Sequence, residues 1–218
     1  MMINGSIDIA DSEIHIWLVE LDKLNSGGRR LEDLLPDDIL LKAARRRTDE
    51  ARSRYLAAQA SLRIVLSQYL GADPTNIILD YSAKGKPFIP YSTLGFNLSD
   101  SGGLAAVAVA SKERVGVDIE QIRQDFDCLR IARRRFRAEE TDFLSAFAGD
   151  RLIREFFRLW VRKEAYLKAV GSGISGGLDC RVDEVEGWTI ANIDVGDAFA
   201  AAFAVSSSQI VPKLFSLM

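Results

Sequence analysis

The chain has 218 residues, of which 48% are hydrophobic and 27% charged, and its formal net charge is −3. Such a chain can bury a sizeable core, as one large domain or two small ones. The near-neutral charge argues against nucleic-acid binding as a global property, and two cysteines are too few for a disulfide framework.

Membrane and secretion signals are not evident in the sequence. No apolar run approaches membrane-spanning length, and the N-terminus lacks the basic and apolar regions of a signal peptide. We therefore expect a soluble, cytoplasmic protein in its reduced state, with no membrane and no nucleic acid among its partners.

The first part of the chain mixes strands with helices. An alternating strand is predicted at residues 14–21, and helices are predicted within 36–70, with Gly71 as their end. Further extended segments are expected at residues 77–81, 87–89, 95–98 and 104–110. We place a first unit at residues 1–111.

Basic residues concentrate in the helical part of this unit. Between Lys42 and Arg63 there are seven basic residues and two acidic ones, in a chain that is acidic overall. A local positive patch of this kind suits phosphate groups.

A second unit, residues 112–218, opens with an acidic strand at 114–122. Strand alternation sends Asp118 and Glu120 to one face, together with Gly116. Neighbouring like charges repel, and a divalent cation with oxygen ligands makes such a pair favourable. A solvated strand face is the alternative interpretation.

Helices at about 127–148 and 151–170 follow, and then extended segments near 180–185, 188–193 and 198–205. In the second helix, Glu164 shares a face with apolar residues such as Trp160. A carboxylate aimed inward needs a lysine, a metal or a polar cleft. Lys168 lies one turn later, so it either forms a simple i,i+4 ion pair with Glu164 or acts at the site.

These segments resemble the 4′-phosphopantetheinyl transferases, in particular the longer, surfactin-synthetase-activating type built from two related halves. Matching segments cover roughly residues 13–205. They comprise Gly116-Val-Asp118-Ile-Glu120, the set Trp160, Lys163, Glu164, Ala165 and Lys168, the pair Gly171 and Gly173, Lys84-Gly-Lys86-Pro87, Phe96-Asn97-Leu-Ser99 and the helical stretch Arg54 to Arg63.

The resemblance implies an α+β fold, a pseudo-dimer of two similar α+β halves with the active site in the cleft between them. The repeated order of strand, long helices, glycine and strands agrees with this. The implied reaction moves 4′-phosphopantetheine from coenzyme A to a serine of an acyl or peptidyl carrier protein. Mg²⁺ is the implied cofactor, and two fused halves favour a monomer.

By resemblance, Asp118, Glu120 and Glu164 hold Mg²⁺ against the pyrophosphate, and Lys168 contacts the pyrophosphate or the developing charge. The family often carries a phenylalanine and, four residues later, a glutamate that takes the serine proton. The spacing from Phe136 and the helix face favour Glu140 over Glu139, while Glu164 remains a rival base.

Coenzyme A contacts are expected from residues of the first unit, namely Lys42, Arg54, Lys84, Lys86, Asp100 and Ser101. One position departs from the family, which commonly has a histidine where this chain has Asp100. An anionic aspartate cannot hold a phosphate as that histidine does. The alternative function is therefore a coenzyme A or carrier-protein binding homologue with reduced or lost catalysis.

Overall fold

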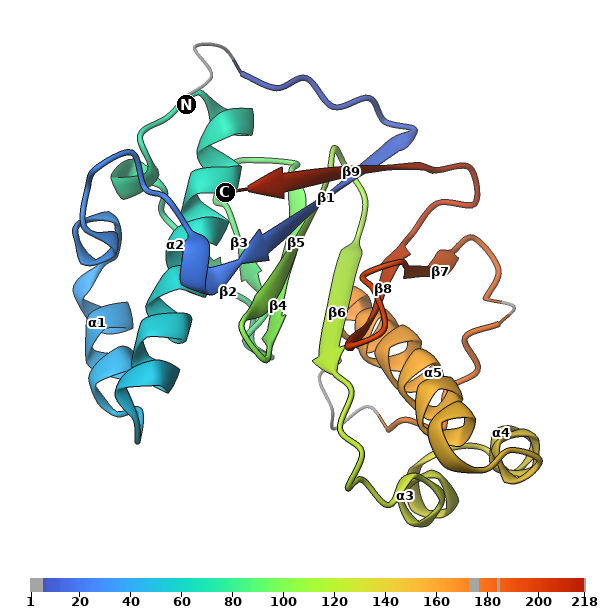
Figure 1. Ribbon diagram of the computed structural model, residues 1–218. Coiled ribbons are helices and arrows are strands. Elements are labelled where there is room, and N and C mark those ends of the chain that lie inside the picture. Colours follow the sequence, from blue (N-terminus) through green and yellow to red (C-terminus); the bar gives the residue numbers. More distant parts are fainter. Residues whose placement is uncertain (1–5, 173–176, 184, 218) are drawn as a thin grey trace.

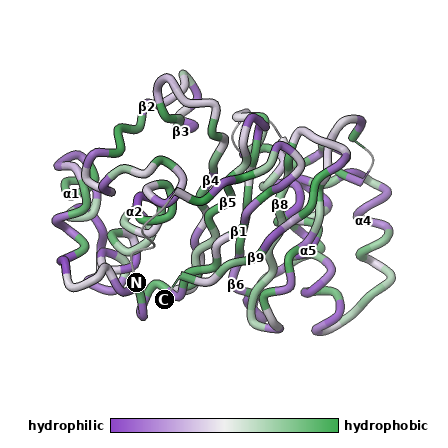
Figure 2. Tube along the Cα trace, turned by 90° about the horizontal axis from the view of Figure 1, so that it is seen from above, coloured by the Kyte–Doolittle hydropathy of each residue, from purple (hydrophilic) through white to green (hydrophobic). Residues whose placement is uncertain are grey.

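Two larger β-sheets stand side by side in the middle of the molecule, with long helices at either end (Figures 1 and 2). The computed structural model describes residues 6–172, 177–183 and 185–217. Gly173, part of the predicted glycine pair, lies outside the described residues. The mixed α+β class expected from the sequence is confirmed.

The first sheet has the order β4-β5-β1-β9. Strands β4 (Gly95–Ser101), β5 (Leu104–Ala110) and β1 (Glu13–Glu20) pair antiparallel, whereas β9 (Val211–Leu217) runs parallel to β1. The sequence did not predict β9. This strand returns from the second half of the chain and completes the sheet of the first half (Figure 1).

The helix α2 (Asp49–Leu70) covers the outer face of the first sheet, and α1 (Asp37–Ala44) packs beside it. Thr48 accepts a hydrogen bond from the backbone at Ala51, and Gly71 ends the helix with a φ of 62°. The smaller elements of this half are η1 (Leu21–Lys23), η2 (Leu31–Leu34), η3 (Pro74–Asn76), β2 (Asp80–Tyr81) and β3 (Pro87–Phe88).

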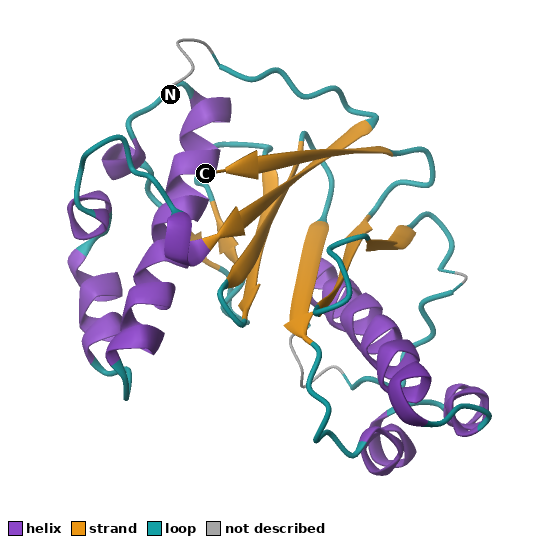
Figure 3. Ribbon diagram, in the orientation of Figure 1, coloured by secondary structure: helices purple, strands orange, loops and turns teal. Residues whose placement is uncertain are grey.

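The second sheet has the order β6-β8-β7, with α5 (Gly149–Val170) against one face (Figure 3). Its strands are β6 (Val115–Gln121), β8 (Phe199–Val205) and β7 (Thr189–Ile193), all antiparallel to their neighbours. The predicted alternation is confirmed. One set of buried side chains packs against the first sheet, with Val115, Val117 and Ile119 meeting Ile14 and Ile16.

The other face of the second sheet is built of small residues, which lets α5 come close. β8 contributes Ala200, Ala202 and Ala204 to this contact, and β6 contributes Gly116. A Cβ atom added at Gly116 would lie 2.1 Å from the carbonyl oxygen of Ala165. Only glycine therefore fits where β6 meets α5.

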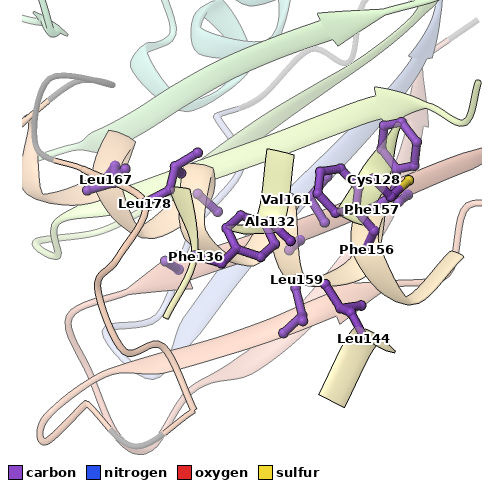
Figure 4. Close-up of a cluster of buried hydrophobic side chains, with 14 of the residues drawn as sticks. Cys128, Ala132, Phe136, Leu144, Phe156, Phe157, Leu159, Val161, Leu167 and Leu178 are labelled. Carbon is purple, nitrogen blue, oxygen red and sulfur yellow. The ribbon is translucent and has the colours of Figure 1, made fainter. Parts of the chain in front are cut away.

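The predicted helix at 127–148 is wrong in one respect, because it is divided into α3 (Cys128–Arg135) and α4 (Ala138–Ser145). Phe136, between them, is extended and buried, with its ring stacked on Phe156 (Figure 4). The free energy gained by burying this aromatic ring exceeds that lost by interrupting the helix. Residues 180–183, which the structure describes, do not form the strand that was expected near 180–185.

Where the two sheets meet, β4 and β6 are joined by hydrogen bonds to side chains instead of by backbone-to-backbone hydrogen bonds. Three buried or half-buried polar side chains of β4 accept hydrogen bonds from alternate N–H groups of β6. The donor and acceptor pairs are Val117 with Asn97 at 2.9 Å, Ile119 with Ser99 at 3.3 Å and Gln121 with Ser101 at 3.1 Å. These bonds satisfy backbone N–H groups along the edge of β6 that pairs with no described strand.

Candidate active site

Three carboxylates gather where β6 faces α5. Asp118 and Glu120 lie on the face of β6 that also carries Gly116, and Glu164 comes from α5. Asp118 is 4% exposed and Glu164 is 6% exposed. The three carboxylates are near enough for their charges to interact, while their convergence on one metal ion stays a prediction.

The charge on Asp118 is held by Lys168 and Ser99. Asp118 Oδ1 lies 2.6 Å from Lys168 Nζ and accepts a hydrogen bond from Ser99 Oγ at 2.9 Å. Lys168 also donates to Ser99 Oγ at 2.8 Å. Of the two interpretations of Lys168, the i,i+4 ion pair with Glu164 is wrong, because its carboxylate partner is Asp118.

Ser101 repeats this arrangement one step along the strand. Its hydroxyl donates to Glu120 Oε2 at 2.9 Å and accepts from the backbone of Gln121. Ser99 and Ser101 therefore orient the two carboxylates of β6. A role for Ser99 was missed in the sequence, although the alternation of Asn97, Ser99 and Ser101 on one strand face was available as a signal.

The charge of Asp118 perturbs the other two carboxylates. Burial raises the pKa of Asp118, and the neighbouring Lys168 opposes this shift. Burial, and then the charge of Asp118, raise the pKa of Glu120 and bring that of Glu164 to about 7. Glu120 and Glu164 thus resist carrying a negative charge next to Asp118.

Two oxygens of this cluster lack hydrogen-bond partners. Asp118 Oδ2 and Glu164 Oε1 are buried and accept no hydrogen bond from any described residue. Within the same part of the chain, no three or more Asp, Glu, His or Cys side chains are arranged closely enough to hold a metal ion. The unsatisfied oxygens and mutual repulsion nevertheless favour a bound cation.

Glu140 does not join this cluster. Its carboxylate lies 2.8 Å from Lys163 Nζ and accepts a hydrogen bond from the backbone of Arg137, which caps α4. Lys163 is fully buried and also donates to the carbonyl of Cys180 at 2.6 Å. The side chain of Glu140 is 10% exposed and its partner is Lys163, so its expected role as the base stays a prediction.

Arg54 and Lys42, both expected at coenzyme A phosphates, already have acidic partners. Arg54 pairs with Asp22 at 3.0 Å and with Glu50 at 2.6 Å. Lys42 pairs with Asp38 at 2.9 Å. The acids that neutralise them come from the same helices or from η1, so the phosphate contacts of these residues stay predictions.

Lys86 was also expected at a phosphate, and this contact stays a prediction, because in the structure Lys86 contacts backbone carbonyls. Its ammonium donates to the carbonyls of Val115 at 2.9 Å and Ala169 at 2.7 Å, which ties the start of β6 to the end of α5. Burial lowers the pKa of Lys86 to about 8. Lys84, two residues earlier, is exposed and remains available to a ligand.

We expect Lys86→Met to destabilise the protein by about 2 kcal/mol, because the carbonyls of Val115 and Ala169 lose their donor. Urea unfolding measures the effect. Lys84→Met is the matched control, since Lys84 lies in the same turn and is exposed. Equal stability of the two variants would contradict a structural role for Lys86.

Asp100 lies at the surface near the cluster. Partial burial raises the pKa of its carboxyl, and the charges that oppose this shift come from Lys168 and Arg46. Lys168 itself pairs with Asp118, so its effect on Asp100 is one of charge alone.

Comparison with known proteins places this site in a family. A sequence model described as the 4′-phosphopantetheinyl transferase superfamily matches residues 114–210, which include all three carboxylates. The 4′-phosphopantetheinyl transferase HetI of Nostoc sp. is 32% identical over 229 residues, covering 96% of this chain and 94% of the relative. The chain belongs to the 4′-phosphopantetheinyl transferase superfamily. It is a transferase enzyme.

Other members of the superfamily are similar to this chain over shorter stretches. A putative 4′-phosphopantetheinyl transferase of Synechocystis sp. is 30% identical over 167 residues, covering 75% of this chain and 67% of the relative. A 4′-phosphopantetheinyl transferase of Bacillus subtilis is 34% identical over 131 residues, covering 60% of this chain and 57% of that protein. The superfamily is thus established, while membership of its longer, two-half type stays a prediction.

None of the helices that the structure describes is long and apolar enough to cross a membrane.

Proposed function

We propose that the protein transfers 4′-phosphopantetheine from coenzyme A to a serine of an acyl or peptidyl carrier protein. The cluster of Asp118, Glu120 and Glu164 carries this proposal, because it unites buried, mutually repelling carboxylates at the segments that match the family. We place the reaction in a cleft between two related halves, residues 1–111 and 112–218, of a monomeric cytoplasmic enzyme of the longer type.

Mg²⁺ is the proposed cofactor, and the carboxylates would have to draw closer together to bind it, because no three such side chains among the described residues form a metal site. Asp118 Oδ2 and Glu164 Oε1 are buried oxygens without a donor among the described residues, and oxygen is the ligand that Mg²⁺ prefers. We propose that these two groups and Glu120 hold the ion, which also keeps water ligands. When bound, Mg²⁺ neutralises charge on the pyrophosphate of coenzyme A.

The transfer step needs a nucleophile, a leaving group and a proton acceptor. The serine oxygen of the carrier protein forms a bond to the β-phosphorus, while the bond from that phosphorus to adenosine 3′,5′-bisphosphate breaks. The serine proton passes to a carboxylate. Lys168, whose side chain is 30% exposed, lies where its ammonium can stabilise charge on the transferred group.

Two carboxylates compete for the serine proton. Glu140 is held by Lys163 and by the backbone of Arg137, which weighs against a direct role. Without a cation, burial and the charge of Asp118 raise the pKa of Glu164 to about 7, and Mg²⁺ on the same carboxylate would lower it. Since Glu140 is engaged in this way, we favour Glu164, in contact with the serine directly or through water.

For Glu140→Gln we expect a stability loss of about 3 kcal/mol, because the fully buried Lys163 loses its counter-charge. Transfer per folded molecule should remain, if Glu140 acts only through structure. Glu139→Gln is the control, since Glu139 is exposed and pairs only with Arg137. A stable Glu140→Gln variant that has lost transfer would restore Glu140 as the base.

The second candidate is a binding homologue with reduced or lost catalysis, favoured by Asp100 in place of the family histidine. One experiment separates it from the enzyme. Apo acyl and peptidyl carrier proteins are incubated with coenzyme A and Mg²⁺, and their masses are measured. A gain of one phosphopantetheine group supports transfer, whereas binding of coenzyme A without any mass gain supports the binding homologue.

A further inference from the structure

A cavity that is separate from the carboxylate cluster lies in the first half, beneath α1 and α2. It has a volume of about 360 Å³ and is lined from η2, α1, α2, η3 and the segment that leads into β2. None of the three clustered carboxylates lines it. The long helix α2 contributes Arg63 to its wall.

Arg63 is a buried cation with an unsatisfied nitrogen. The residue is 3% exposed, and its closest acidic neighbour in charge is Asp38, which forms its ion pair with Lys42. The nitrogen Nη1 is fully buried and unsatisfied. Burial lowers the pKa of Arg63, which reflects the cost of holding a guanidinium out of water. A guanidinium in this position needs an anion.

The acids that line the same cavity are engaged elsewhere. Asp33 lies 3.0 Å from Arg30, and Asp38 lies 2.9 Å from Lys42. The positive charge of Arg63 is therefore only partly offset, by the charge of Asp38, and the two carboxylates repel a highly charged anion. A single negative charge balances Arg63, whereas the second charge of a phosphate would face Asp33 and Asp38.

Apart from Thr75, the rest of the cavity wall is formed by apolar or aromatic residues. Leu34 and Ile77 are buried within it, and Ile78 and Tyr81 stand at its surface with exposures of 72% and 49%. Exposed apolar side chains next to a concave surface are typical of ligand sites. The ligand should therefore combine an apolar body with its one charged group.

We propose that this cavity binds a small organic monocarboxylate, with the carboxylate on the Arg63 guanidinium and the apolar body against Ile78 and Tyr81. A guanidinium can hold a carboxylate through two parallel N–H···O bonds. This site is independent of the transfer reaction.

Titration calorimetry with hexanoate tests the proposal on the whole chain. We expect hexanoate to bind the wild type and Arg52→Met, a control on an exposed position of the same helix. Binding should weaken by at least about tenfold in Arg63→Met, because a charged hydrogen-bonded pair is lost. Hexan-1-ol and inorganic phosphate should bind more weakly than hexanoate.

Arg63→Met should keep or raise the thermal midpoint, since it removes a buried charge that is only partly offset. If this variant does not fold, Ile78→Asp decides, because Ile78 is exposed and an added acid there repels the ligand. Loss of hexanoate binding by Ile78→Asp at an unchanged thermal midpoint supports the site. No binding to the wild type, equal binding to Arg63→Met or Ile78→Asp, or tighter binding of phosphate overturns the proposal.

Discussion

Asp118→Asn should reduce transfer of phosphopantetheine by ~10³-fold, because it removes a charged ligand from the proposed Mg²⁺ site. Asparagine keeps the shape of the side chain and can still accept the hydrogen bond from Ser99. Since burial raises the pKa of Asp118, loss of its charge should leave the thermal midpoint unchanged or higher. The rate of mass gain by a carrier protein and a thermal melt measure the two effects.

Asp11→Asn is the matched control for this prediction. Asp11 pairs with Lys112 at 2.9 Å, as Asp118 pairs with Lys168, but Asp11 is exposed and lies outside β6 and α5. We expect full activity from the control. An Asp118→Asn variant that transfers at the wild-type rate would contradict the proposed metal site. An Asp118→Asn variant that fails to fold would contradict the view that Asp118 serves function at the expense of stability.

Gly116→Ala should be the most damaging single methyl group in the second half. Its Cβ would lie 2.1 Å from the carbonyl oxygen of Ala165 and 2.5 Å from the nitrogen of Ala169, so β6 and α5 must separate. We expect a loss of about 3 kcal/mol, which lowers the thermal midpoint by roughly 6–12 °C in a chain of this size.

The same change should also impair transfer, since β6 carries Asp118 and α5 carries Glu164. Gly71→Ala is the control, because no atom lies within 4 Å of the added Cβ and only its left-handed φ of 62° is strained. That strain costs about 1 kcal/mol. A Gly116→Ala protein as stable as the Gly71→Ala protein would show that α5 can withdraw from β6 without penalty.

Local pattern was enough to predict the centre of the proposed site. Alternation along β6 and the apolar stripe of α5 place Asp118 and Glu164 on facing surfaces, and each pattern depends only on neighbouring residues. The family resemblance joined two segments that lie about forty residues apart. Packing then brought them together through Gly116, whose need for close approach is not visible in periodicity.

The contacts of the basic residues could not be predicted from local pattern, for a physical reason. Whether a lysine faces a phosphate or a protein acceptor depends on contacts between distant segments. Lys86 meets the carbonyl of Ala169, and Arg54 meets Asp22, in both cases across long stretches of chain. Similarly, β9 was missed because its partner β1 is at the other end of the sequence, and its residues Val211 and Leu214 are exposed.

The return of β9 to β1 orders the events of synthesis on the ribosome. The strands β1, β4 and β5 emerge early and can pair at once, but β1 keeps one open edge until Val211 and the residues after it have been translated. An unpaired edge invites association with other chains. The whole second sheet and α5 must therefore be synthesised while this edge of β1 is unpaired. We expect the nascent chain to need chaperones during that time. Stalled or truncated products that end before β9 should aggregate through β1.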